Sequence, residues 1–176
     1  MSLKEPDLRA ALGVAAPEIG EAVREASAAL TRLGIRHALC GGIAVSSYAT
    51  PRTTQDVDFL VGEEAFDHAG AIASVKAGVP SRVGSVVVDT VPLVPDLLAL
   101  DDLLASAPRS DGVPIVPADA LIAMKLVAGR LKDQADIVAL LNSGSVDPRA
   151  CRRFLVERGF QKWIALYDSL VARPTE

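Results

Sequence analysis

The chain has few of the residues that bind zinc or build disulfide frameworks. Its 176 residues include two cysteines, Cys40 and Cys151, and two histidines, His37 and His68. Two cysteines make neither a disulfide framework nor a metal cluster, and two isolated histidines supply no zinc site. Cys40 ends an apolar stretch and is most simply a small core residue. The sequence therefore gives no sign of a disulfide scaffold or a zinc protein.

Aromatic residues and long apolar runs are also scarce. Half of the chain is apolar but only 4% is aromatic, so we expect a core of Val, Leu, Ile and Ala. No segment approaches the length of a membrane span, and the first residues lack the apolar stretch of a signal peptide. We therefore expect a cytoplasmic protein that has no membrane partner.

An excess of basic residues is missing too. The 18 Lys and Arg residues face 22 Asp and Glu residues, for a net charge of −4. This balance argues against a protein that coats nucleic acid. Residues 125–162 nevertheless contain eight Lys or Arg and four Asp or Glu residues. A modest basic surface beside an acidic site is compatible with this distribution.

Hydrophobic periodicity predicts a series of helices and strands. We expect helices over 17–33, 42–49, 63–78, 97–107 and 118–130, two more between 147 and 172, and strands over 36–40, 55–61, 85–91 and 113–116. The predicted organisation is a partly flexible N-terminal segment over 1–16, a core domain over 17–143 and a C-terminal helical extension over 144–176, with frayed ends at 1–6 and 173–176. The length suits one core domain with a small appendage.

Two glycines, Gly41 and Gly42, follow the first predicted strand and precede a helix. Missing side chains let backbone N–H groups approach a ligand closely. The N-terminus of a helix favours an anion such as a triphosphate. The pattern is therefore typical of a phosphate-binding turn, and its alternative is a tight strand-to-helix connection without a ligand.

Two carboxylates, Asp56 and Asp58, lie on the next predicted strand. Residues two apart on a strand project from the same face, while Val57 and Phe59 point into the core. Like charges so close resist ionising together unless a cation neutralises them, and Mg2+ bound jointly with substrate phosphates suits such oxygen ligands. An Asp-x-Asp alone is more often a solvated strand end. The order and spacing of the whole set favour a functional site.

Two further residues complete this set. Arg52 precedes the acidic strand, where it could clamp a phosphate or pair with Asp56 or Asp58 to hold the empty site; we expect the second role. Asp89 lies among valines on the strand over 85–91, where a carboxylate is costly unless it is paired or bound to a metal. Asp89 is therefore the expected third acid if its strand lies beside strand 55–61.

The stretch as a whole resembles the active-site signature of a known superfamily. Gly41-Gly42, a short helix, Arg52-Thr53-Thr54 and Asp56-Val57-Asp58 resemble the DNA polymerase β-like nucleotidyltransferases, and within them the AbiEii-type abortive-infection toxin or minimal nucleotidyltransferase branch. A second motif of that branch is matched by Lys125, Arg130, Lys132, Asp133 and Asp136. The resemblance implies an α+β (mixed α/β) nucleotidyltransferase fold, with a small mixed sheet flanked by helices and a short C-terminal helical extension.

Ordinary helix electrostatics is the alternative for the second motif. Arg130 and Asp133 are three apart, and Lys132 and Asp136 are four apart, so both pairs could be surface contacts of a few tenths of a kcal/mol. Lys125 stands on a mostly apolar helix. Its side chain either extends to water or reaches into a site, and a bound triphosphate would favour the position inside the site.

The resemblance implies a nucleotidyltransferase that moves a nucleoside monophosphate from a nucleoside triphosphate to an acceptor hydroxyl. Asp56, Asp58 and Asp89 would be the catalytic and metal-binding residues, with two Mg2+ ions or, alternatively, Mn2+. Nucleotide contacts would come from Gly41, Gly42, Arg52, Thr54, Lys125, Arg130, Lys132 and Asp133. The acceptor would be RNA, such as a tRNA 3′ end, if the protein is a toxin or phage-defence component with a cognate antitoxin. The alternatives are a small-molecule or protein acceptor, and a module that binds a nucleotide or a partner without turnover.

Overall fold

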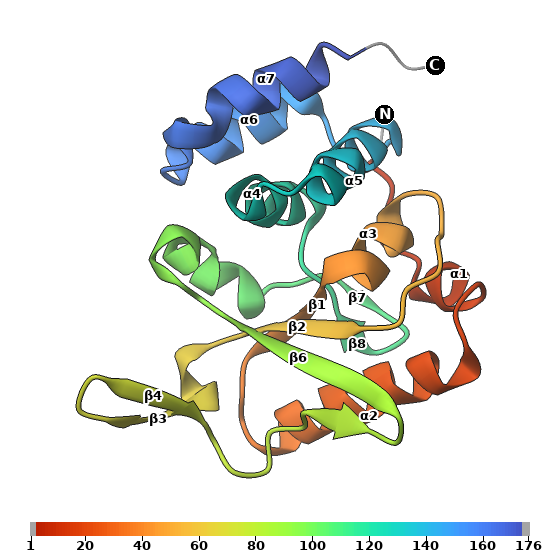
Figure 1. Cartoon of the computed structure of the whole chain (residues 1–176). Helices are drawn as coiled ribbons and strands as arrows, with labels where there is room; N and C mark the ends of the chain where they lie inside the picture. Colours follow the sequence, from red (N-terminus) through yellow and green to blue (C-terminus); the bar gives the residue numbers. More distant parts are fainter. Residues whose placement is uncertain (1–2, 174–176) are drawn as a thin grey trace.

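A four-stranded mixed sheet lies at the centre of the molecule (Figure 1). The computed structural model describes residues 3–173. In spatial order the strands are β1 (His37–Cys40), β2 (Val57–Val61), β6 (Val86–Pro92) and β5 (Arg82–Val83). The β2 and β6 strands are parallel, whereas β1 and β5 pair antiparallel with their neighbours. The structure confirms the expected α+β class with a small mixed sheet flanked by helices.

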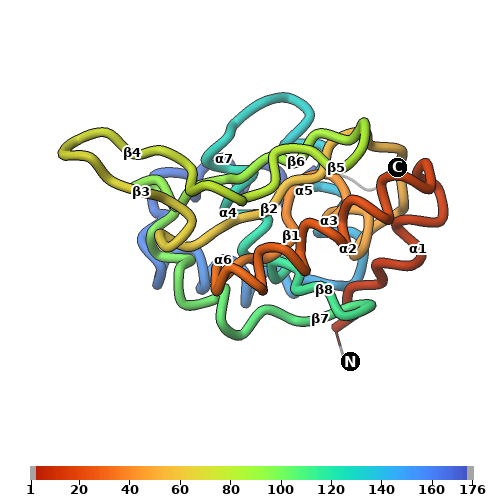
Figure 2. The backbone as a smooth tube through the Cα atoms, turned by 90° about the horizontal axis from the view of Figure 1, so that it is seen from below, coloured from red at the N-terminus to blue at the C-terminus, as the bar shows by residue number. Residues whose placement is uncertain are grey.

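Helices cover both faces of this sheet. On one face lies α2 (Pro17–Arg32), seen in front of the sheet in Figure 2. Its buried residues Ile19, Val23, Ala26 and Leu30 recur at helical spacing, as predicted. On the other face lie α3 (Gly41–Tyr48) and α4 (Ala118–Ala128) (Figure 1). The sheet is thus covered by helices on both faces.

The segment between β2 and β6 differs from the prediction. Instead of a helix over 63–78, a short 3-10 turn, η1 (Glu63–Ala65), leads into a hairpin of β3 (Phe66–Ala69) and β4 (Ile72–Val75). The hairpin projects from the body of the molecule (Figure 1). Apolar residues three apart suggested a helix, but Gly70 has a φ of +64° and favours a two-residue turn. The predicted helix is therefore wrong.

The chain after β6 runs through a long 3-10 helix and a small hairpin. This helix, η2 (Pro95–Leu104), replaces the α-helix expected over 97–107. The hairpin consists of β7 (Arg109–Ser110) and β8 (Val113–Pro114), and Ile115 forms a bridge to Leu39 of β1. The strand expected over 113–116 is thus confirmed at its first residues and lies beside β1.

The predicted helix over 118–130 ends at Ala128. Gly129 has a φ of +67°, and its N–H donates to the carbonyl of Lys125 over 3.0 Å. Such a left-handed residue ends a helix and turns the chain. A second helix, α5 (Leu131–Asn142), begins directly after it and packs on α4. The two halves of the second motif therefore lie on different helices.

Two helices form the C-terminal part, as expected. They are α6 (Pro148–Glu157) and α7 (Ile164–Val171), joined by a 3-10 turn, η3 (Gln161–Trp163). They pack on α4 and α5 (Figure 1). At the other end, the short helix α1 (Leu8–Leu12) was not predicted. The expected frayed ends lie partly outside the described residues, and the domain boundaries and the flexibility of 1–16 stay predictions.

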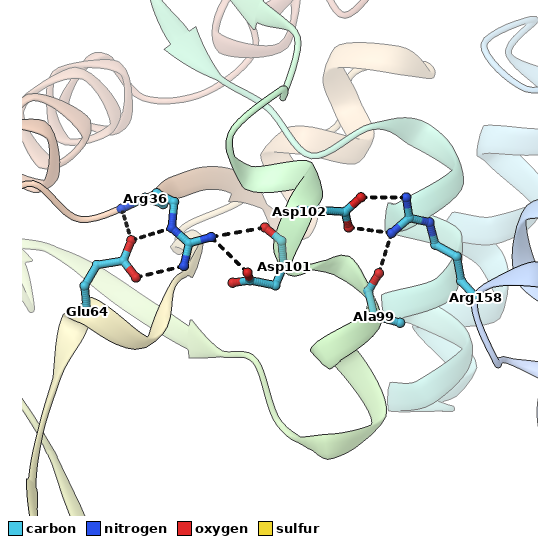
Figure 3. A network of polar contacts seen from close by, with 6 residues as sticks. All are labelled: Arg36, Glu64, Ala99, Asp101, Asp102 and Arg158. Carbon is cyan, nitrogen blue, oxygen red and sulfur yellow. Dashed lines mark hydrogen bonds and ion pairs between the residues drawn. The ribbon is translucent and has the colours of Figure 1, made fainter.

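Two arginines tie η2 to both sides of the molecule (Figure 3). Arg36 next to β1 bonds Glu64, with 2.8 Å from Nε to Oε1, and Asp101 of η2, with 2.9 Å from Nη1 to Oδ2. From α6, Arg158 bonds Asp102 of η2. Burial alone would raise the pKa of Glu64, but the bonds from Arg36 outweigh it and lower this pKa to about 2. The η2 helix is thus fastened between the sheet and the C-terminal helices.

One negative finding concerns membranes. Within residues 3–173, none of the helices combines the length and the apolar character needed to cross a bilayer.

Candidate active site

A cavity of about 370 Å³ lies where β2 and β6 meet the first turn of α3, the α4 helix and the start of α5. All of the predicted catalytic and nucleotide-binding residues line it, whereas Asp136 of the second motif does not. The lining residues of the predicted set are Gly41, Gly42, Arg52, Thr54, Asp56, Asp58, Asp89, Lys125, Arg130, Lys132 and Asp133. These residues come from segments far apart in the chain. The structure therefore brings the predicted set together, while the role of each stays a prediction.

Asp58 and Asp89 stand side by side on the two parallel strands. They are direct partners in the β2–β6 register, as expected for a third acid on the neighbouring strand. Asp56 lies just before β2 and is exposed. Burial raises the pKa of Asp58, and the nearby charges of Asp89 and Asp56 raise it further. Among the described residues, none of the three acids takes part in an ion pair.

Gly41 allows the backbone to approach this acidic group. Its φ is +66°, and a Cβ at this position would lie 2.0 Å from Oδ2 of Asp58. Any side chain here would displace the carboxylate. Gly42 faces the other side of the turn, where a Cβ would lie 3.2 Å from Oγ1 of Thr54. The first turn of α3 is thus packed between the acids and the loop over 50–56.

Lys125 holds a buried position on the opposite wall. Its side chain does not extend to water, because the residue is only 8% exposed. Its Nζ lies 3.0 Å from Oδ1 of Asp133 and 2.8 Å from Oδ2 of Asp136. Both acids come from α5, across the break at Gly129. The two helices are therefore joined by a buried ion-pair network that borders the cavity.

The expected pairing of Arg52 with Asp56 or Asp58 is wrong. Its Nη2 donates instead to both carboxylate oxygens of Asp136, over 2.8 Å and 3.1 Å. Asp136 is buried, and a buried carboxylate is costly unless a cation pairs with it. Arg52 thus joins the network of Lys125 and leaves the strand acids without a cation.

Arg130 and Asp133 form the pair that their spacing suggested. The Arg130 Nε lies 2.6 Å from Oδ2 of Asp133, and the same carboxylate oxygen accepts from the backbone N–H of Arg130 at the start of α5. Burial alone would raise the pKa of Asp133, but the bonds from Arg130 and Lys125 lower it. The alternative pair between Lys132 and Asp136 is not among the described ion pairs, since Asp136 binds Lys125 and Arg52. Lys132 lies exposed at the cavity.

One wall of the cavity is aliphatic and was not predicted. It consists of Val91, Leu97, Leu121, Met124, Val127 and Ala128. A signal for part of it was present in the sequence. Leu121, Met124 and Ala128 share one helical face with Lys125, so naming that lysine also indicated its neighbours. Asp136 was matched in the second motif, but its contact with Arg52 had no local signal.

The strand acids have the ligand chemistry that Mg2+ prefers, but they do not form a complete metal-binding site by themselves. Carboxylate oxygens are its preferred ligands, and the unpaired, mutually repelling acids would gain from a cation. Within residues 3–173, however, no three His, Cys, Asp or Glu side chains are grouped to hold a metal ion. Mg2+ usually takes one or two carboxylates together with substrate phosphates and water. Asp58 and Asp89 fit this shared mode of binding.

Comparisons with known proteins give a structural likeness but no family. No protein-family model matches the chain, and no curated protein matches it. Among solved structures, the chain is similar to the crystal structure of an antigenic nucleotidyltransferase-like protein from Paracoccidioides brasiliensis. The match has a TM-score of 0.46 and 17% sequence identity, and it covers 93% of this chain and 96% of that chain.

Proposed function

We propose that the protein is a metal-dependent nucleotidyltransferase that moves a nucleoside monophosphate from a nucleoside triphosphate to an acceptor hydroxyl. The observation that carries this proposal concerns two acids, Asp58 and Asp89. They lie in register on parallel strands beside the Gly41-Gly42 turn and enter no ion pair among the described residues. Four basic side chains, those of Arg52, Lys125, Arg130 and Lys132, line the same cavity. A site for metal and a site for phosphates would thus share one space.

Each group has a defined task in this proposal. Asp58 and Asp89, with Asp56 at the edge, would hold Mg2+ or Mn2+. The ion would neutralise phosphate charge and favour the alkoxide form of the acceptor. The basic side chains bind the polyphosphate and stabilise the charge on the departing pyrophosphate. A bond forms from the acceptor oxygen to the α-phosphorus while the bond to pyrophosphate breaks. The protein therefore contributes positioning and electrostatics.

The acceptor would be RNA if the chain belongs to the AbiEii-type branch. In that case a tRNA 3′ end is the expected substrate, and a cognate antitoxin would be the partner. The net charge of −4 favours a small-molecule or protein acceptor instead. A binding module without turnover is a second candidate function. The observation that favours it is the lack, within the described residues, of three acids grouped to hold a metal.

The decisive experiment combines nucleotide, metal and acceptor. Purified protein is incubated with Mg2+, each of the four labelled nucleoside triphosphates and total cellular RNA, and pyrophosphate release and label transfer are measured. Asp56→Ala serves as the inactive control. Asp168→Asn serves as the matched control, because it removes an acid that pairs with Arg152 far from the cavity.

Each result selects one reading. Label on RNA that depends on Asp56 supports the transferase and its RNA acceptor. Label only on an added small molecule keeps the chemistry and rejects the toxin role. Nucleotide binding without pyrophosphate release from any of the four nucleotides would reject the transferase in favour of the binding module.

A further inference from the structure

Asp136 lies behind the wall of the cavity and does not line it. It is 5% exposed, and its two carboxylate oxygens accept from two cations that do line the cavity. Lys125 approaches Oδ2 to 2.8 Å, and Arg52 Nη2 approaches Oδ1 to 2.8 Å. One buried acid therefore sets the position of two basic groups that come from unrelated parts of the chain.

The partner Arg52 belongs to the loop over 50–56, between α3 and β2. This loop also carries Thr54, which faces Gly42, and Asp56, which borders the acidic group. The loop side of the pair is half-exposed, whereas the α5 side is buried. The contact with Asp136 is thus an ion pair that fastens this loop to α5.

We propose that Asp136 is a positioning residue that couples the loop over 50–56 to Lys125 and so presets the polyphosphate-binding wall. The proposal rests on the proposed function, because the two cations would receive the nucleotide phosphates. It adds a residue that touches neither substrate nor metal. Because both cations bind Asp136, a displacement of Arg52 would shift Lys125, and a displacement of Lys125 would shift Arg52.

A merely structural acid would behave differently. Losing one partner of a buried ion pair lowers stability and thus the fraction of active enzyme, which lowers kcat and leaves KM unchanged. A positioning residue changes how well the folded protein binds polyphosphate. The split between KM and kcat, and the affinity for a ligand that cannot react, therefore separate the two roles.

The test uses Asp136→Asn, which keeps the shape of the side chain and removes its charge. Binding of inorganic tripolyphosphate with Mg2+ is measured by titration calorimetry at a temperature where the variant is folded. KM and kcat for the nucleotide are measured on the same preparation. Arg52→Gln tests the same coupling at a half-exposed position, in case Asp136→Asn does not fold. Asp168→Asn is the control, since its partner Arg152 lies on α6.

We expect Asp136→Asn to weaken tripolyphosphate binding about tenfold and to raise KM by a similar factor, with Asp136→Glu restoring part of the loss. We expect Arg52→Gln to have at least as large an effect, because it also removes a phosphate contact. The double variant should lose less than the sum of the two single losses, because both variants remove the same coupling. Affinity and KM within twofold of the parent protein in Asp136→Asn, or additive losses in the double variant, would overturn the proposal. Coupled tripolyphosphate binding without any nucleotide transfer would support it and reject the proposed transferase instead.

Discussion

Two groups of acids lie at or directly behind the wall of the same cavity, and they differ in their ion pairs. The helix acids, Asp133 and Asp136, are buried and paired with Lys125, Arg130 and Arg52. The strand acids, Asp56, Asp58 and Asp89, enter no ion pair among the described residues, and the pKa of Asp58 is raised. A fold that can supply cations to one group leaves the other without them. In the proposed function, the helix acids would organise the site and the strand acids would bind the metal.

The largest expected effect separates the two groups by activity. Replacing Asp58 by Asn should lower nucleotide transfer by about 1000-fold, roughly 4 kcal/mol of transition-state stabilisation, because the metal loses a ligand. Asp89→Asn should behave alike. Initial rates of pyrophosphate release at saturating Mg2+ measure this, with circular dichroism to show that the fold persists. Transfer retained within tenfold in Asp58→Asn would remove this residue from the proposed site.

The second effect separates them by stability. Removing Asp133 takes one of two acidic partners from the buried Lys125 and removes the side chain that caps the start of α5. Asp133→Ala should therefore lower the free energy of unfolding by about 3–5 kcal/mol. Asp102→Ala is the matched control, since it removes an exposed partner of Arg158 and should cost under about 1 kcal/mol. Urea unfolding of both variants gives the comparison. Equal costs would mean that the buried network is not what holds α4 to α5.

A third prediction concerns the close approach at the turn. Gly41→Ala combines a left-handed backbone with a Cβ placed against Asp58, whereas Gly34→Ala at a φ of +69° meets no atom within 4 Å. Both should lose about 1–2 kcal/mol of stability from backbone strain. Only Gly41→Ala should also lose transfer activity, by at least about tenfold, since the carboxylate must move. Thermal unfolding and transfer assays on the pair test this, and equal activities would dissociate the turn from the acids.

The smallest effect is a difference in sign with pH. In the absence of divalent ions, the raised pKa of Asp58 means that its ionisation opposes folding, so Asp58→Asn should stabilise the protein at neutral pH. That gain should shrink as the pH falls through the raised pKa to the ordinary Asp range. The lowered pKa of Asp133 gives the opposite sign, so the cost of Asp133→Asn is present at neutral pH and fades as the pH falls below the ordinary Asp range. Melting temperatures against pH would show the two trends, and parallel curves would contradict the contrast.

Local spacing explains how much of the site could be predicted from the sequence. The Gly41-Gly42 turn and the Asp56-Asp58 pair are short-range patterns, and alternation along one strand was sufficient to indicate Asp89. The contact between Arg52 and Asp136 joins residues 84 apart, so it depends on how the loop meets α5 and has no local signature.

The fold shows the same division. The α2 helix has clear apolar spacing, a proline at its start and Gly34 after its end, and it was predicted nearly to the residue. The hairpin of β3 and β4 was mistaken for a helix because its apolar residues are three apart while nearly all of it is exposed. No burial pattern then distinguishes the two structures, and Gly70 was the informative residue. The early end of α4 was likewise marked by Gly129, a residue that allows the left-handed turn.

The parallel pairing of β2 and β6 has a consequence for how the protein folds. The two acids that would share a metal are joined only after the whole segment of η1, β3, β4 and β5 has closed a long crossover. Contacts of large sequence separation form late, because the loop entropy must be overcome first. In the proposed function, a refolding chain should therefore gain metal binding only after β6 has docked beside β2. Recovery of metal binding would then report on that step of folding.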